Sequence, residues 1–221
     1  MLVARWPHGA GSSAAEACGR DASPQFTGNV ALLSPFLLSS PQASTIRTIC
    51  TTPVAGDVRF ELHGQPLAIL QSPDYTSVAD ASWQAGDALG VSALGADVAA
   101  FSGTLLTPLE VTGLGPPLQQ TPVVIVHDAP LRVSWQPEAR DGETMLVLIE
   151  VLQTGGSRDV RCTVADGDGQ VTVDPRLLAP LVPAENATVH LVRSISSSTS
   201  SSNATIALDG EAWLSLPITI E

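Results

Sequence analysis

Three consecutive strand-like segments between residues 131 and 164 constrain the fold of this chain more than any other feature. Residues 131–136 alternate apolar and polar side chains, which is the period of a β-strand with one face in a core. Met145–Leu152 is apolar on both faces apart from one glutamate, as in a central strand covered on both sides. Residues 160–164 alternate again. These segments predict a β-sheet core that closes around Trp135.

Similar short segments recur along the whole chain, separated by Gly, Pro, Asp and Ser. No segment keeps a helical period for the length of an ordinary helix, so we expect an all-β chain with less than about a tenth of its residues in helix. One short helical start is expected at Asp174, because Asp caps a helix and Pro175 suits its first turn. The other expected strands are Asn29–Leu33, Ser44–Cys50, Val58–His63, Leu67–Gln71, Ser77–Trp83, Ala88–Leu94, Ala99–Leu106, Leu109–Thr112, Val123–His127, Gln170–Val173, Thr188–Ile195, Ala204–Leu208 and Ala212–Ile220.

The stretch Gly113–Gln120 is the expected domain boundary. Its two Gly, two Pro and two Gln suit an extended linker or a crossing between sheets. This boundary predicts a flexible N-terminal tail at 1–25, an N-terminal β-sandwich domain at 26–118 and a C-terminal sandwich domain at 119–221.

The sequence LRVSWQP at 131–137, followed by the apolar strand Met145–Leu152, resembles the second and third strands of fibronectin type III modules. The resemblance implies an immunoglobulin-like antiparallel β-sandwich in the C-terminal half, with Trp135 in its core. The pattern departs from the family at one point, because the only tyrosine is Tyr75 and the tyrosine corner of such sandwiches is therefore absent. In its general sequence character, without a diagnostic motif, the whole chain also resembles uncharacterised exported β-proteins of GC-rich bacteria.

The charge balance argues against two classes of partner. The formal net charge is −12, and all basic residues are Arg, scattered along the chain. Nucleic acids and anionic membranes both require a basic face, so neither is expected as a partner. The longest apolar run, Val30–Leu38, is interrupted by Ser34 and Pro35 and falls short of the roughly 18 residues of a transmembrane helix.

The N-terminal residues bear on where the protein works. Ala15-Glu16-Ala17-Cys18 is similar to a lipoprotein cleavage site, although Glu16 does not fit and no hydrophobic segment precedes it. We therefore expect an extracellular, periplasmic or cell-envelope protein whose signal segment is not seen in this chain.

Three cysteines cannot all pair within one chain. A Cys18–Cys50 disulfide and a fully reduced chain both remain open, and Cys162 is expected to be a reduced, buried side chain on the inner side of its strand. No set of His and Cys has the spacing of a zinc site.

No catalytic motif is complete, so no catalytic residue is assigned. Gly90–Gly95 is one residue longer than a hydrolase nucleophile elbow and lies within a strand pattern. The histidines His8, His63, His127 and His190 are far apart in sequence, although a triad assembled in space is not excluded.

Asp166-Gly167-Asp168-Gly169 is the densest acidic cluster. A calcium loop needs more oxygen ligands than two carboxylates, whereas Asp-Gly is a strong hairpin-turn signal. We expect a turn here, and neither a metal site nor a cofactor site elsewhere.

Two further features are candidate contact surfaces. Ser194–Asn203 is a low-complexity stretch, expected to be a long flexible connection or a ligand-contacting loop. Asn186 and Asn203 both begin N-glycosylation patterns. Among Trp6, Trp83, Trp135 and Trp213, the last is expected to be partly exposed, because Ser215 shares its strand face.

Two functions therefore remain open. The first is a non-catalytic exported β-sandwich module for binding, adhesion or structural support, with an unknown protein or glycan partner. The second is a hydrolase or the accessory carbohydrate-binding domain of a secreted enzyme. Facing acidic, His or Ser side chains in a pocket favour the second, and a filled interior without them favours the first.

Overall fold

The computed structural model describes most of the chain from residue 55 onward. Before residue 55 it describes four short strands. For residues 2–5, 17–19, 30–34, 44–49 and 76–81 it describes the backbone alone. Expectations that concern Trp6, His8, Cys50, Tyr75 and Trp83 lie outside the described residues. The described residues are 2–5, 17–19, 30–34, 44–49, 55–71, 76–81, 84–138, 140, 142–153, 156–181 and 186–221.

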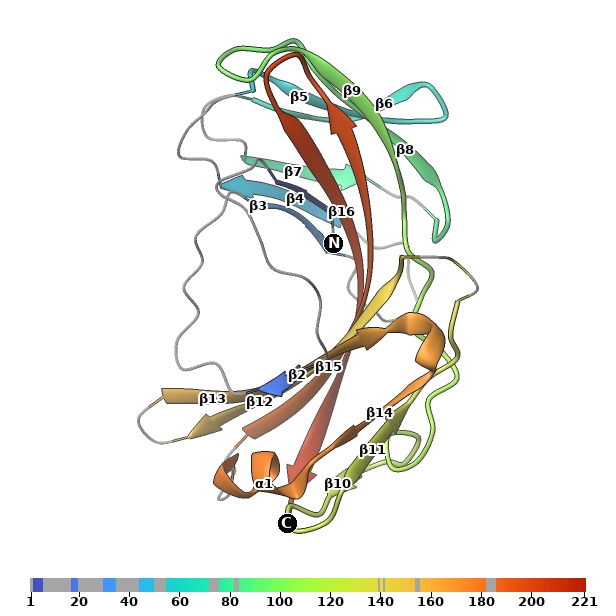
Figure 1. The fold of residues 1–221 in the computed structure, drawn as a ribbon, viewed down its shortest axis with the longest axis vertical. Coiled ribbons are helices and arrows are strands. Elements are labelled where there is room, and N and C mark those ends of the chain that lie inside the picture. Colours follow the sequence, from blue (N-terminus) through green and yellow to red (C-terminus); the bar gives the residue numbers. More distant parts are fainter. Residues whose placement is uncertain are drawn as a thin grey trace. The chain divides into compact units, whose positions relative to one another are not determined.

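The described chain is mostly β, as expected, and its helices are single turns (Figure 1). These turns are α1 (Pro175–Leu178) and the 3-10 turns η1 (Asp166–Asp168) and η2 (Ala179–Leu181). The strands are β1 (Leu2–Arg5), β2 (Ala17–Gly19), β3 (Val30–Ser34), β4 (Ser44–Ile49), β5 (Val58–Leu62), β6 (Gln65–Leu70), β7 (Thr76–Ala81), β8 (Ala88–Ala93), β9 (Phe101–Leu106), β10 (Val123–Ile125), β11 (Leu131–Ser134), β12 (Thr144–Gln153), β13 (Gly156–Ala165), β14 (Gln170–Val173), β15 (Asn186–Ser200) and β16 (Thr205–Ile220).

The strands form several sheets whose pairs are antiparallel except for one. The largest has the order β1-β16-β15-β12-β13-β2, and β10 joins it by pairing with β16 in parallel. The smaller sheets have the orders β11-β14, β3-β4-β7 and β6-β5-β8-β9. The expected immunoglobulin-like topology stays a prediction.

The chain forms two compact units, each assembled from separated segments. The first contains Phe26–Leu109 and Ser194–Ala212, and the second contains Glu110–Arg193 and Trp213–Glu221. The strands β15 and β16 contribute to both units. The expected tandem domains, 26–118 and 119–221, stay a prediction about which parts of the chain fold independently.

The core of the second unit confirms the predicted inner faces of its strands. Met145, Val147, Ile149 and Val151 on β12 are fully buried, and Leu131, Val133 and Trp135 face the same core. The opposite face of β12 differs from the expectation of a fully covered strand, because Leu148 is half-buried and Leu152 is 53% exposed. That face is the first candidate for a contact surface.

The expected linker is part of this unit. The main-chain amide of Gly115 donates to the main-chain oxygen of Ser134 (3.0 Å), and that of Gln136 donates to the main-chain oxygen of Thr112 (2.8 Å). A Cβ at Gly115 would lie 2.0 Å from the Ser134 hydroxyl oxygen, so a larger residue here would force the Ser134 side chain to rotate. Because residues 112–115 pack and bond along β11, they are not a free connection, and no strand forms at Leu109–Thr112.

In the first unit, the serine-rich stretch is a strand. Residues 194–200 continue β15, and the chain turns at 201–204 into β16, which runs without a break where we expected two strands. The hydroxyls of Ser197 and Thr199 donate to the Thr104 and Ser102 main-chain oxygens of β9 at 3.1 and 2.6 Å. The expectation of a flexible loop was wrong, because these hydroxyls satisfy strand carbonyls.

Asn203 holds the turn at the end of this strand pair. Its side-chain oxygen accepts from the Ala99 amide (2.9 Å), and its side-chain nitrogen donates to the Asp97 oxygen (2.8 Å). Both ends of the amide are therefore committed. Asn186 is instead exposed at the first position of β15.

Two segments of the expected flexible tail are strands. β1 pairs with β16, and β2 pairs with β13, where Cys18 stands directly opposite Cys162. Cys162 is disulfide-bonded, so the expectation of a reduced core thiol was wrong. The helical start at Asp174 is confirmed, because the Asp174 carboxylate accepts from the Arg176 amide at 2.7 Å.

Candidate functional site

The outer face of the second unit's sheet gathers polar side chains from three neighbouring strands. This outer face comprises Leu148 and Glu150 on β12, His190 on β15, and Trp213 and Ser215 on β16. His190 Nδ1 lies 2.8 Å from the Ser215 hydroxyl oxygen, and its Nε2 lies 3.8 Å from a Glu150 carboxylate oxygen. The strand order, visible in Figure 1, brings together residues up to 65 positions apart.

Burial and charge act on His190 in opposite directions. The side chain of His190 is only 18% exposed, whereas that of Glu150 is 47% exposed. Burial lowers the pKa of His190, and the Glu150 carboxylate opposes this shift. The neutral imidazole is therefore favoured at pH 7, and in the tautomer that carries its proton on Nε2, Nδ1 accepts from the Ser215 hydroxyl while Nε2–H faces Glu150.

Trp213 borders this polar group. Its ring and that of His190 meet edge to face, with centroids 5.8 Å apart. Trp213 is half-buried, which confirms the expected partial exposure, and Ser215 beside it is exposed. The outer face thus presents an indole surface next to a hydroxyl, an imidazole and a carboxylate.

The order Ser215, His190, Glu150 is that of a hydrolytic triad, but the setting differs from one. All three residues lie within strands of one sheet, where main-chain N–H groups point along the sheet plane rather than out of its face. An oxyanion hole needs such donors aimed at the reacting oxygen. The arrangement is better suited to hydrogen bonding with a ligand than to acyl transfer.

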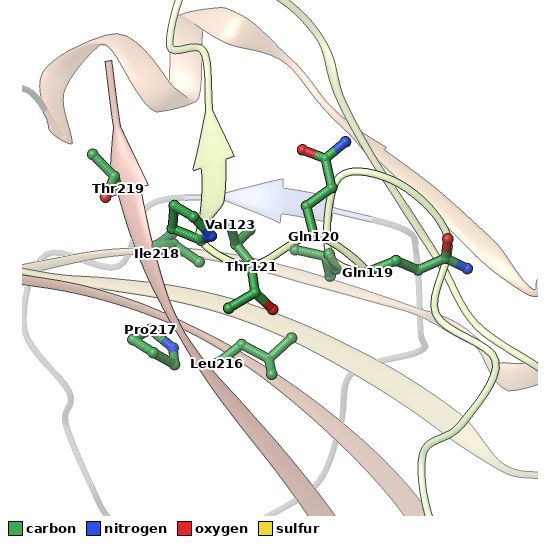
Figure 2. A pocket seen from close by; sticks show the side chains of 10 residues that line it. Gln119, Gln120, Thr121, Val123, Leu216, Pro217, Ile218 and Thr219 are labelled. Carbon is green, nitrogen blue, oxygen red and sulfur yellow. The ribbon is translucent and has the colours of Figure 1, made fainter.

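A cavity of about 360 Å³ lies elsewhere in the second unit (Figure 2). Residues 118–123 and 216–219 line it, with Leu216 and Pro217 on β16 across from the segment around Thr121. Its lining contains no acidic residue, His, Ser or Cys. The cavity therefore lacks the facing titratable groups that would favour an enzyme.

Arg193 organises a buried polar cluster in the same unit. The side chain is 1% exposed, and its Nε donates to an Asp166 carboxylate oxygen at 3.0 Å. Its other nitrogens donate to the main-chain oxygens of Glu110 (2.7 Å) and Gln136 (2.6 Å). The planar guanidinium thereby joins β15, η1 and two connecting segments.

Two glutamates complete this buried cluster. Glu138 Oε1 lies 3.8 Å from Arg193 Nη1, and Glu143 Oε1 lies 3.9 Å from Arg140 Nη1. The Asp166 carboxylate also accepts from the Glu138 amide at 2.6 Å. Burial, followed by the adjacent Glu138, raises the pKa of the Glu143 carboxyl to about 8.

The other residues singled out in the sequence are dispersed. His63 is 74% exposed and lies 3.9 Å from Asp87, while His127 Nδ1 lies 2.6 Å from the main-chain oxygen of Glu221. Ser92 stands on strand β8, as expected. Among the residues that the structure describes, neither of these two histidines pairs with a Ser or Cys side chain.

Asp166-Gly167-Asp168-Gly169 was expected to form a hairpin turn, and the structure corrects this. η1 joins β13 and β14, which belong to different sheets, and the Asp166 side chain is completely buried. Glu138, Glu143 and Arg193 were missed altogether. The one sequence signal for them is a charged residue at a core-facing position, which Arg193 provides at the end of the apolar run of β15.

Comparisons with known proteins leave the family open. No family model matches this chain, and no curated protein matches it. Among solved structures, a match is found to the fibronectin(III)-like modules of Clostridium thermocellum CbhA, at 13% identity and a TM-score of 0.26, covering 82% of this chain and 87% of that one. No described helix is long and apolar enough to cross a membrane.

Proposed function

We propose that this chain is a non-catalytic, exported β-sandwich module that binds a neutral polysaccharide through the outer face around His190 and Trp213. The observation that carries the proposal is the gathering of an indole, an imidazole, a hydroxyl and a carboxylate on three adjacent strands. An indole offers a flat apolar surface with a polar edge. The neighbouring groups supply donors and acceptors for sugar hydroxyls.

The charges of this face support a neutral, hydroxyl-rich ligand. The buried centres of protein–protein interfaces are depleted in charged residues, whereas this face carries the Glu150 carboxylate beside His190. The chain's net charge of −12 and the Glu150 carboxylate both oppose an anionic ligand. A neutral polysaccharide is the partner class that meets both conditions.

Two features support the exported location. Cys162 is disulfide-bonded, and disulfides persist mainly in oxidising compartments outside the cytosol. The low share of charged residues, 14%, accompanies a largely β architecture of the kind common in extracellular modules. We therefore propose that the protein works in the cell envelope or the extracellular space.

One observation favours a second candidate, a hydrolase that uses Ser215. The 2.8 Å contact between Ser215 and a neutral His190 is the geometry of a nucleophile beside its base. The position of Ser215 within a strand, without main-chain donors aimed at the face, counts against this candidate.

One experiment separates the two candidates. The full chain is run in affinity electrophoresis through gels that contain a panel of neutral and acidic polysaccharides, and each polymer is assayed for released reducing ends and esters. We expect retardation by at least one neutral polymer and no released product. Product formation that Ser215→Ala and His190→Ala both abolish would replace the binding function with the hydrolase.

A further inference from the structure

Glu138 and Glu143 form a buried pair of carboxyl groups outside the proposed binding face. Their side chains are 3% and 0% exposed. None of their four carboxylate oxygens has a hydrogen-bond partner among the described residues. An ionised carboxylate without a donor is costly to bury, so two of them side by side require another source of stabilisation.

The charges around the pair do not balance if every group is ionised. Arg193 lies 3.8 Å from Glu138, and Arg140 lies 3.9 Å from Glu143. Asp166 on η1 is a third acidic group, and its carboxylate is already held by Arg193 and by the Glu138 amide. Among the described residues of this cluster, three carboxylates therefore face two guanidinium groups, one cation fewer than full ionisation would need.

We propose that Glu138 and Glu143 share one proton, and that this proton makes the stability of their buried cluster with Arg193 and Asp166 depend on pH. With the proton in place, Glu143 donates to the Glu138 carboxylate, and the pair carries one negative charge. The five charged groups are then neutral overall. Loss of the proton leaves three carboxylates with two guanidinium groups, and the cluster then holds an uncompensated negative charge that destabilises it.

The electrostatics of the site agree with this assignment. The pKa of Glu143 is raised to about 8, first by burial and then by Glu138, while Arg140 opposes the shift. Adjacent carboxyl groups in a buried site titrate as one unit. The last proton to leave such a pair has a pKa above the ordinary range of a carboxyl group.

A proton fits this site better than a metal ion. Among the described residues, no group of three His, Cys, Asp or Glu side chains is arranged to hold a metal. A guanidinium group already lies 3.8 Å from Glu138, and another lies 3.9 Å from Glu143. A calcium or magnesium ion takes six or more oxygen ligands and would be repelled by both guanidinium groups.

The shared proton predicts how the stability of the folded state depends on pH. The native state holds the Glu143 proton up to about pH 8, whereas the unfolded chain releases it near pH 4.5. Between these values the folded state binds more protons than the unfolded state. Its stability is therefore highest at the acidic end of this window and falls as pH rises through it.

The direct test is a carbon-13 NMR titration of the glutamate carboxyl groups in the full chain. We expect one carboxyl resonance to titrate with a midpoint near 8 and to disappear in Glu143→Gln. The variant Glu138→Gln removes the neighbouring negative charge, so the midpoint of Glu143 should move down. If every glutamate carboxyl titrates below about pH 5.5, the shared proton does not exist.

A second test measures the consequence for stability and remains informative if Glu143→Gln folds poorly. The urea midpoint of the wild type should fall between about pH 5 and pH 8 and level off above this range, whereas the fall should be absent in Glu143→Gln and end at a lower pH in Glu138→Gln. Asp168→Asn, which changes an exposed carboxylate on the same turn, is the control and should keep the wild-type slope. Calcium binding is the competing outcome. If millimolar calcium raises the urea midpoint of the wild type at alkaline pH but not that of the variants, the site holds a metal, and the shared proton is overturned.

Discussion

The indole nitrogen of Trp135 donates a hydrogen bond to the main-chain oxygen of Asp166 at 3.1 Å. The same Asp166 holds Arg193 through its carboxylate. The apolar core and the buried polar cluster of the second unit are therefore joined at one residue. This contact connects the strand pattern that was visible in the sequence to a charge network that was not.

Substitution of Trp135 separates the two contributions of its side chain. Trp135→Ala should lower the free energy of unfolding by about 3–5 kcal/mol, because it removes a large buried aromatic. Trp135→Phe should cost about 1–3 kcal/mol, since it leaves the Asp166 oxygen buried without a donor. Urea denaturation followed by far-ultraviolet circular dichroism measures both. A loss below about 1 kcal/mol for Trp135→Ala would place the side chain outside the core.

Removal of the Arg193 guanidinium should be among the most damaging single changes in the second unit. Arg193→Met should cost about 3–5 kcal/mol, because Asp166 is left as a buried charge without its cation. Arg193→Lys should also destabilise, since an ammonium group cannot reach all three acceptors. Arg132→Met, at an exposed position on β11, is the matched control and should change stability by less than about 0.5 kcal/mol. Equal losses of stability in Arg193→Met and Arg132→Met would contradict the stabilising role of the Arg193 cluster.

The fit of Gly115 against β11 predicts a coupled pair of substitutions. Gly115→Ala should cost about 1–3 kcal/mol, because its Cβ would lie 2.0 Å from the Ser134 hydroxyl oxygen. Ser134→Ala removes that oxygen, so the double variant should recover part of the loss. Gly167→Ala, where a Cβ meets nothing within 4 Å, is the control. Additive costs in the double variant would mean that the clash is not the cause.

His190 should titrate below the ordinary histidine range. Burial lowers its pKa, and Glu150 opposes the shift, so Glu150→Gln should lower the pKa further. Proton NMR of the imidazole resonances measures both midpoints. The unfolded chain takes up this proton near pH 6.5, before the folded state does, so stability should fall as pH drops below that value. An unchanged midpoint in Glu150→Gln would remove Glu150 from the site.

The sequence predicts most strands of this chain but not how they are joined across sheets. The alternation in residues 131–136 and the apolar run Met145–Leu152 give β11, β12 and their inner faces, because period and burial are local properties. The low-complexity stretch Ser194–Asn203 was wrongly predicted to be a flexible connection. Its hydroxyls bond to strand carbonyls about 95 positions away. Composition carries no information about such partners.

The charged cluster and the disulfide of Cys162 were hidden for a related reason. Arg193 and Asp166 are 27 positions apart on different elements, and their contact follows only from how β15 and η1 pack. Cys162 meets β2 through strand register, which a spacing rule cannot supply. The partial exposure of Trp213 was predictable because it depends on alternation along one strand.

The central claim is that the face around Trp213 binds a neutral polysaccharide without turning it over, and one measurement tests it most directly. Titration calorimetry compares the wild-type chain with Trp213→Ala, on the neutral polymer that retards the protein most in affinity electrophoresis. Leu94→Ala, at an exposed position in the first unit, is the control. The account predicts that Trp213→Ala weakens binding at least about tenfold, as expected for loss of a stacking aromatic, while the control binds like the wild type. Equal affinity in all three proteins, or binding by none to any neutral polymer, would contradict it.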